Sequence, residues 1–399
     1  MMAVDQPERQ VLAPQPTGRK LVRFRDDVSQ ADAAAILRQV SGQTVVSAAE
    51  IGSLGASVRM SSASDAIVLL DRFPIAAVGG GFERASMVAN ALQAEDMVDD
   101  VRPEFWMFAT QSPPWEDDGY RTWGLDATGV DTSAYDGSGI SIAVLDTGID
   151  LGHPDFVGRR IFTESFVARE TIDDIQGHGT HTAGTAAGGR PRSANVPRYG
   201  VASGADLYVG KVLNNRGAGR ELDIIAGIDW AISKGCAVVS MSLSRPVSPH
   251  EQPDAFYEDI ARRALQAGTL LIAAAGNESD RRYNYIAPVG APANAPSIVA
   301  VAAIGADAGV ATFSCGSTGT GDVDICGPGV QTLSAVPTPQ VYKKMSGTSM
   351  ACPHVAGIAA LWAQSDPALR GQALRDALIR SAWPIGNRRD VGAGLVQAP

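Results

Sequence analysis

Five short apolar runs, separated by stretches of helical pattern, constrain the fold of this chain more than any other feature. The runs lie at residues 140–145, 207–212, 237–241, 270–274 and 298–301. Runs that are apolar almost throughout are typical of strands buried in a parallel sheet. Helices are expected between them, at 180–187, 221–234 and 253–267. This alternation predicts an α/β fold with a doubly wound, mostly parallel sheet, whose active site lies at the carboxyl ends of the strands.

The N-terminal part of the chain has a different organisation. Residues 1–19 are expected to be flexible, and residues 20–108 are expected to form a small α+β domain. Within it, strands are expected near 21–25, 66–70 and 98–108, and helices near 30–40 and 83–95. That order predicts a compact, ferredoxin-like sheet covered on one face by two helices. Residues 109–122 are rich in proline and acidic residues and predict an exposed linker, with the larger domain over 123–399.

Composition and charge argue against two kinds of partner. The chain has 399 residues and a formal net charge of −10, which argues against nucleic acid. The most apolar early stretch, 66–88, is interrupted by Asp71, Arg72 and Pro74, which is not the pattern of a membrane span. The first residues have no apolar core of the kind found in a secretory signal peptide. We therefore expect a cytoplasmic protein or one exported by another route, unless the sequence lacks its true start.

The motif with the most chemical content is GTSMACPH at residues 347–354. Ser349 lies just before an apolar segment, 355–362, that is expected to be helical. The free N–H groups and positive dipole of a helix start would stabilise a developing negative oxygen there. Considered alone, Ser349 would be better explained as a structural helix cap. Because position 351 is Ala, the motif is not the G-x-S-x-G elbow of the α/β-hydrolases.

Two further motifs supply the groups that a serine nucleophile needs. His178, in GHGTH, is the candidate general base, and Asp146, in VLDTG after a predicted buried strand, would fix its tautomer and stabilise the imidazolium. His178 and His181 lack the glutamate of an H-E-x-x-H motif, so a zinc site is not expected. His181 and His354 are interpreted as structural, because each lies in or beside an apolar helical stretch.

In their order along the chain, these three motifs resemble those of the subtilisin-like serine proteases, also called peptidase family S8. The segments SMSLS at 240–244 and AAAGNE at 273–278 resemble further motifs of that family, and the resemblance runs from about Trp123 to the C-terminus. It implies a serine endopeptidase that hydrolyses peptide bonds of protein or peptide substrates through an acyl-enzyme. Catalysis would require no cofactor.

The resemblance also implies a zymogen. Residues 20–108 would be a pro-domain that assists folding and acts as an intramolecular inhibitor. The chain would then cut itself in the linker, between about Phe105 and Trp115.

Further roles around the triad follow from the same resemblance. Asn277 would donate to the oxyanion together with the N–H of Ser349. The substrate-binding edges and first pocket would comprise Gly217, Gly219, Ser242, Leu243, Ser244, Ala275, Gly276 and Gly290. The family commonly has Gly-Gly where this chain has Ser244-Arg245. We therefore expect a narrower, more positive pocket rim and a preference for smaller or more polar side chains.

Two structural details are also carried by the resemblance. Asp155 matches a calcium-binding position of many relatives, but the partner loop carries Arg190 and Arg192. Calcium prefers oxygen ligands, so these arginines are unfavourable neighbours for such a site. The Ala291–Pro292 bond matches one that is often cis in the family.

The chain has four cysteines, of which Cys236 and Cys352 are expected to be buried as small apolar side chains. Cys315 and Cys326 flank a turn-rich loop, and a disulfide between them could form in an oxidising compartment.

Two other interpretations remain open at this stage. The chain could be a catalytically silent subtilisin-like fold used for binding, or a dedicated processing protease that cuts one partner precursor. Reaction with a serine-directed phosphonate would distinguish the first, and a digest of unrelated unfolded proteins the second.

Overall fold

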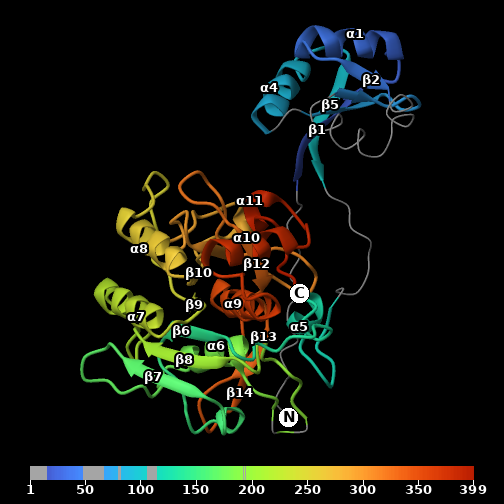
Figure 1. Cartoon of the computed structure of the whole chain (residues 1–399). Coiled ribbons are helices and arrows are strands. Elements are labelled where there is room, and N and C mark those ends of the chain that lie inside the picture. Colours follow the sequence, from blue (N-terminus) through green and yellow to red (C-terminus); the bar gives the residue numbers. More distant parts are fainter. Residues whose placement is uncertain (1–15, 48–66, 80–81, 106–114, 192, 194) are drawn as a thin grey trace, which may run out of the picture. The chain divides into compact units, whose positions relative to one another are not determined.

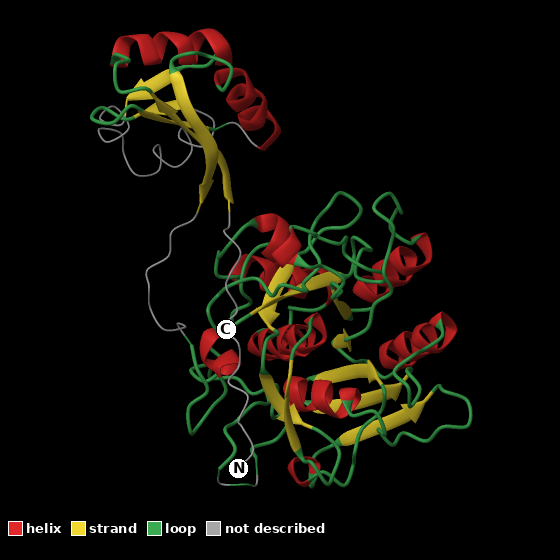
Figure 2. Ribbon diagram, turned by 180° about the vertical axis from the view of Figure 1, so that it is seen from behind, coloured by secondary structure: helices red, strands yellow, loops and turns green. Residues whose placement is uncertain are grey.

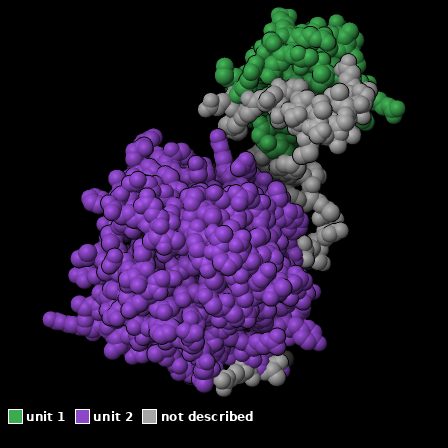
Figure 3. Space-filling model, in the orientation of Figure 1, with its two compact units in different colours: residues 1–110 green, residues 111–399 purple. Residues whose placement is uncertain are grey.

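The computed structural model describes residues 16–47, 67–79, 82–105, 115–191, 193 and 195–399. The chain divides into two compact units, Met1–Thr110 and Gln111–Pro399 (Figure 3). Residues 1–15 of the expected flexible N-terminus and most of the expected cleavage region lie outside the described residues. Residues 16–19 were also expected to be flexible, and this was wrong, because they form the start of a strand. None of the described helices is long and apolar enough to cross a membrane.

The smaller unit is a five-stranded sheet with two helices. Its elements are β1 (Pro16–Phe24), α1 (Gln30–Ser41), β2 (Val45–Ser47), β3 (Ile67–Leu69), β4 (Ile75–Val78), α4 (Phe82–Leu92) and β5 (Val98–Phe105). The strand order is β2-β3-β4-β1-β5, with β1 antiparallel to both β4 and β5. The two helices contact each other on one face of the sheet (Figures 1 and 2), as predicted. The short strands β2 and β4 were not predicted.

The larger unit is built on a seven-stranded sheet in which every neighbouring pair is parallel. Its strands are β6 (Ser141–Asp146), β7 (Ile161–Ser165), β8 (Asp206–Lys211), β9 (Val238–Met241), β10 (Leu270–Ala274), β11 (Val299–Ile304) and β12 (Ile325–Pro328). Their order is β12-β11-β10-β9-β6-β8-β7. Each of the five predicted runs is one of these strands, and the predicted doubly wound fold is confirmed.

Helices cover both faces of this sheet (Figure 1). They are α5 (Trp123–Ala127), α6 (His178–Ala187), α7 (Glu221–Ser233), α8 (Ala255–Gln266), α9 (Thr348–Ser365), α10 (Gly371–Ser381) and α11 (Arg388–Val391). Short 3-10 turns occur at Pro154–Phe156 and Arg281–Tyr283, and β13 (Thr332–Ala335) and β14 (Tyr342–Met345) form a hairpin. Helices α6 and α9 pack together on one face. Because α9 is apolar all round, it is almost entirely buried.

Part of the expected linker is packed against the larger unit. The Trp115 N–H donates to the carbonyl of Ala306, and its ring stacks on Trp123 with the centroids 6.5 Å apart. Asp117 forms an ion pair with Lys344 at 2.7 Å. The segment from Trp115 onwards therefore belongs to the larger unit and not to a free linker.

The disulfide considered for Cys315 and Cys326 is not formed, because all four cysteines are free and buried. The Cys315 thiol instead donates to Glu278 Oε2 at 3.2 Å. Cys326 lies within β12, where it is fully buried. Each thiol is thus held in its own environment, and burial raises the pKa of Cys315 to about 12.

Candidate active site

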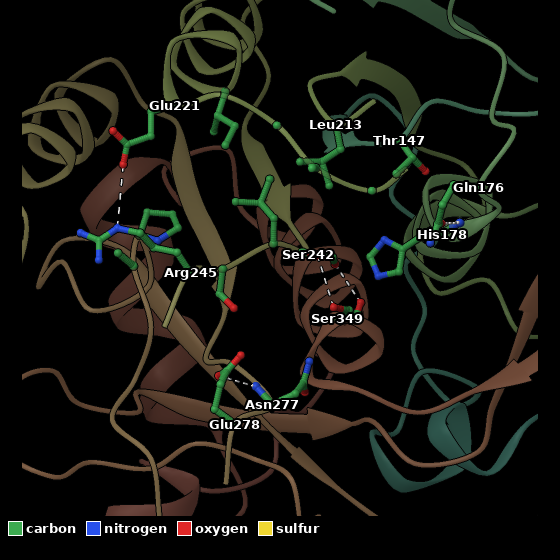
Figure 4. Close-up of a pocket in the computed structure, with 18 of the residues that line it drawn as sticks. Thr147, Gln176, His178, Leu213, Glu221, Ser242, Arg245, Asn277, Glu278 and Ser349 are labelled. Carbon is green, nitrogen blue, oxygen red and sulfur yellow. Dashed lines mark hydrogen bonds and ion pairs between the residues drawn. The ribbon is translucent and has the colours of Figure 1, made fainter. Parts of the chain in front are cut away.

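The candidate site lies where several parallel strands end. Asp146 is the last residue of β6, Ser242 follows β9 directly, and Asn277 follows β10 after two residues. From β8 the chain crosses to the other side of β6 to form β9, so the strand order changes direction here. Such a switch point opens a crevice at the carboxyl ends of a parallel sheet. A cavity of about 540 Å³ lies there, with His178 and Ser349 in its wall (Figure 4).

Asp146 and His178 form a close pair. The Nδ1 of His178 is 2.8 Å from Oδ1 of Asp146 and 3.0 Å from Oδ2. Because a carboxylate accepts at Nδ1, the neutral ring carries its hydrogen on that nitrogen, and Nε2 is left to act as a base. Asp146 is fully buried and also accepts from the N–H of Thr147 and the hydroxyl of Thr182.

The environment of His178 changes its basicity. Burial alone lowers the pKa of the imidazole, since it penalises the charged form. The charge and hydrogen bond of Asp146, with a smaller contribution from the charge of Asp174, outweigh that effect and raise the pKa above its usual value. The site is therefore arranged to stabilise an imidazolium at this position.

Helix α6 is held against the end of β6 by its first turn. Buried Asp174 accepts from the N–H groups of Gly177 and Thr180, while the Thr147 hydroxyl donates to Asp174 and accepts from the N–H of Gly179. A Cβ on Gly179 would lie 2.2 Å from the carbonyl oxygen of Gly148. The glycine at position 179 therefore permits a close backbone contact beside His178.

Ser349 is the second residue of α9, and it forms two hydrogen bonds with Ser242. Pro353 has no N–H to donate to the carbonyl of Ser349 four residues earlier. The hydroxyl of Ser242 donates to that carbonyl instead, at 2.8 Å. In return the Ser349 hydroxyl donates to the carbonyl of Ser242 at 3.3 Å. Figure 4 shows His178 on the other side of Ser349, facing it.

The side chain of Asn277 has a fixed orientation. Its Oδ1 accepts from the N–H of Thr348 at 2.8 Å and from the Thr348 hydroxyl at 3.0 Å. The amide nitrogen must therefore point away from Thr348, and Figure 4 shows this side chain beside Ser349. A donor amide and the start of a helix thus lie at the same place, as an oxyanion site requires.

The cavity wall contains part of the predicted pocket. Five of the predicted residues line it, namely Gly217, Gly219, Ser242, Leu243 and Ser244. The other three, Ala275, Gly276 and Gly290, are buried behind the wall. The backbone of Gly290 packs closely against the rim residue Arg245, since a Cβ at position 290 would lie 2.7 Å from the carbonyl oxygen of Arg245. The Ala291–Pro292 bond is cis, as predicted.

Several residues of the wall were not predicted from the sequence, most notably Glu221, Ile224, Tyr257 and Glu278. Glu221 follows the predicted edge at Gly219 by two residues, which was the available signal. Arg245 also differs from expectation: its guanidinium turns to Glu251, at 2.6 Å, so its charge is not free at the rim.

Asp155 is poorly suited to hold calcium. It is 4% exposed, and its Oδ2 accepts from the hydroxyls of Tyr199, at 2.8 Å, and Tyr342, at 2.9 Å. Burial and the neighbouring carboxylate raise the pKa of both phenols, so both remain donors. Among the described residues, no group of three or more His, Cys, Asp or Glu side chains is placed to hold a metal ion. The donor set around Asp155 is that of a hydrogen-bonded carboxylate.

Comparisons with known proteins agree with this architecture. The Subtilase family profile matches residues 137–395. Subtilisin E from Bacillus subtilis (strain 168) is 38% identical over 274 residues, which cover 68% of each protein. Subtilisin Savinase from Lederbergia lenta is 37% identical over 280 residues, 69% of this chain and 96% of that protein.

Solved structures give the same result. A cold-adapted subtilisin-like serine proteinase is 32% identical with a TM-score of 0.56, covering 67% of this chain and 91% of the other. Sphericase is also 32% identical, with a TM-score of 0.58, covering 69% and 98%. Given this fold and these matches, the chain belongs to the subtilase family of serine-type endopeptidases.

Proposed function

We propose that Asp146, His178 and Ser349 form the catalytic triad of this endopeptidase and that Asn277 donates to its oxyanion. The observation that carries the proposal is the pair of the buried Asp146 carboxylate and His178, 2.8 Å apart, in which His178 faces Ser349 in the wall of one cavity (Figure 4).

In the proposed reaction, Nε2 of His178 takes the proton of the Ser349 hydroxyl as its oxygen attacks the peptide carbonyl. Asp146 stabilises the imidazolium that results. The tetrahedral oxygen receives hydrogen bonds from the Asn277 amide and the Ser349 N–H. His178 then gives its proton to the leaving amine, and water hydrolyses the acyl-enzyme in a second, similar step. No step needs a metal or an organic cofactor, and we propose that Asp155 holds no calcium.

Substrates would be protein or peptide segments in extended form. They would add as a strand between Gly217–Gly219 and Ser242–Ser244 and place one side chain in the first pocket. Both segments line the cavity, which supports this assignment.

The smaller unit would serve as the pro-domain. Its strand order β3-β4-β1-β5, with a helix after β1 and another after β4, supports a ferredoxin-like unit of the inhibitor type. We expect cleavage between Phe105 and Trp115, a region that lies for the most part outside the described residues.

The test is the intact mass of the purified protein over time beside Ser349→Ala. Wild type should lose its N-terminal unit while the variant stays whole, and a serine-directed phosphonate should label wild type at Ser349 only. If wild type neither changes mass nor reacts with the phosphonate, the silent binding protein becomes the better hypothesis. Ser138→Ala, the same change at an exposed serine, serves as the matched control.

A further inference from the structure

Part of the cavity at Ser349, here called the hollow, is lined by Leu243, from the segment that follows β9, and by two further apolar or aromatic side chains. Successive side chains of an extended segment point to opposite sides, so Leu243 faces away from the side of Ser242 and Ser244. Ile224 and Tyr257 line the cavity with Leu243 and give the hollow an apolar floor. Both are almost fully buried, so this floor is a firm surface.

The charges in the wall of the cavity are unbalanced. The wall contains two carboxylates, Glu221 and Glu278, and one guanidinium, Arg245. Arg245 lies 2.6 Å from Glu251 and only 4.0 Å from Glu221, and its hydrogen bond to Glu251 raises its pKa. Glu251 therefore takes up most of the charge of Arg245. Glu221, whose side chain is 62% exposed, keeps most of its own charge for a ligand.

The position of the hollow fixes which substrate side chain could reach it. Side chains of an extended substrate alternate, so the first residue before the scissile bond enters the first pocket and the second and fourth point to the Leu243 side. Leu213 lines the cavity nearer to His178 than Glu221 does in Figure 4. The second side chain would lie at Leu213, and the fourth, about 7 Å further on, in the hollow.

We infer that this hollow selects a lysine or arginine at the fourth residue before the scissile bond. The inference rests on the proposed function. The methylene stem would pack on Leu243 and Ile224, and the cation would lie beside Glu221 and next to the ring of Tyr257. An acidic side chain at that position would meet Glu221 and be disfavoured.

Two fluorogenic peptides that differ only at the fourth residue test this inference. One carries lysine and the other norleucine, which has the same stem without the charge. The full-length protein, after any self-processing, should cleave the lysine peptide with a kcat/KM about fivefold higher at low salt. The ratio should shrink as salt rises. Glu221→Gln should bring the ratio of the two kcat/KM values to about one, whereas Glu278→Gln, on the opposite wall, should leave that ratio as it is in wild type.

The outcomes separate this inference from the proposed function. Equal rates on the two peptides, or a lysine preference that survives Glu221→Gln, would overturn the inference while Ser349-dependent cleavage stands. If the full-length protein cleaves neither peptide, or if Ser349→Ala cleaves as fast as wild type, the proposed function fails and this inference fails with it.

Discussion

His178 carries two opposed effects in one side chain. Its burial favours the neutral ring, while Asp146 and Asp174 favour the charged one, and the net pKa is raised. Because only the neutral imidazole can take the proton of Ser349, kcat/KM should fall as pH drops through this raised pKa, above the ordinary value of about 6.5. A pH profile measures it, and Asp146→Asn should move the acid limb to lower pH. An acid limb that stays in place in this variant would argue against the pairing.

Replacement of Asp146 should also slow the reaction itself. Serine proteases lose about 10⁴-fold in kcat when the triad aspartate becomes asparagine, because the imidazole takes the wrong tautomer. A loss of that order is expected here, since Asp146 accepts at Nδ1.

Asn277 offers a second test at the residue scale. Its Oδ1 is held by Thr348, so its amide nitrogen is already oriented before a substrate arrives. Removal of an oxyanion-hole asparagine in subtilisin costs about 10²–10³-fold in kcat. We expect Asn277→Leu to lower kcat by that order and to change KM little, because the hydrogen bond forms mainly in the transition state. Steady-state kinetics beside Asn195→Leu, a surface control, would reveal an unchanged kcat if the assignment is wrong.

At the scale of elements, the packing of the first turn of α6 against the end of β6 determines the position of His178. A Cβ on Gly179 would lie 2.2 Å from the backbone oxygen of Gly148 and 2.9 Å from its backbone nitrogen. Backbone atoms cannot rotate away from such a clash as the atoms of a flexible side chain can. Gly179→Ala should lower stability by about 1–3 kcal/mol. It should also lower kcat by about 10²-fold, since small displacements of catalytic groups are costly.

The control for this element is Gly119→Ala, because a Cβ at Gly119 has no atom within 4 Å. Its urea midpoint and kcat should match wild type. If Gly179→Ala matched wild type as well, α6 could shift without moving His178, contrary to the contacts described.

Secondary-structure elements and local motifs could be predicted from the sequence, whereas most contacts between residues distant in the sequence could not. Apolar runs identify central strands because both faces of a parallel sheet are covered, whereas β7 at the edge alternates in burial and was missed. Asp146, His178 and Ser349 lie in recognisable local motifs. Contacts between segments distant in sequence leave no such signal, and the pair of Asp155 with Tyr342 joins residues 187 positions apart. The sequence also could not show that Cys315 and Cys326 remain unpaired, because the spacing of two cysteines does not give the directions of their side chains.

For the whole molecule, two buried histidines set a limit on acid stability. Burial lowers the pKa of His181 to about 3 and that of His354 to about 4. The unfolded chain takes up these protons below about pH 6.5, while the folded protein does not. Stability is therefore full above that pH and falls as pH drops towards 4, by up to about 1.4 kcal/mol per pH unit for each histidine.

The dependence of stability on pH can be measured from urea midpoints of Ser349→Ala between pH 7 and pH 5. This variant is used because it cannot digest itself if the proposed triad is right. Adding His354→Gln should make the dependence shallower, because one of the two groups no longer titrates. An unchanged slope would mean that carboxylates alone account for the acid sensitivity.

The cluster around Asp155 leads to a prediction about calcium for the larger unit. Two phenols from separate segments donate hydrogen bonds to one oxygen of this buried carboxylate. These hydrogen bonds stabilise the buried negative charge, so no cation is needed for that purpose. A chelator should leave the melting temperature of Ser349→Ala unchanged, and added calcium should not raise it. Tyr342→Phe, by contrast, should cost about 1–3 kcal/mol because it removes a donor from a buried charge. Tyr283→Phe, at a residue that is 81% exposed, is the matched control. A melting temperature that rises with calcium in this background, and no longer rises once Asp155→Asn is added, would show that Asp155 binds the cation after all.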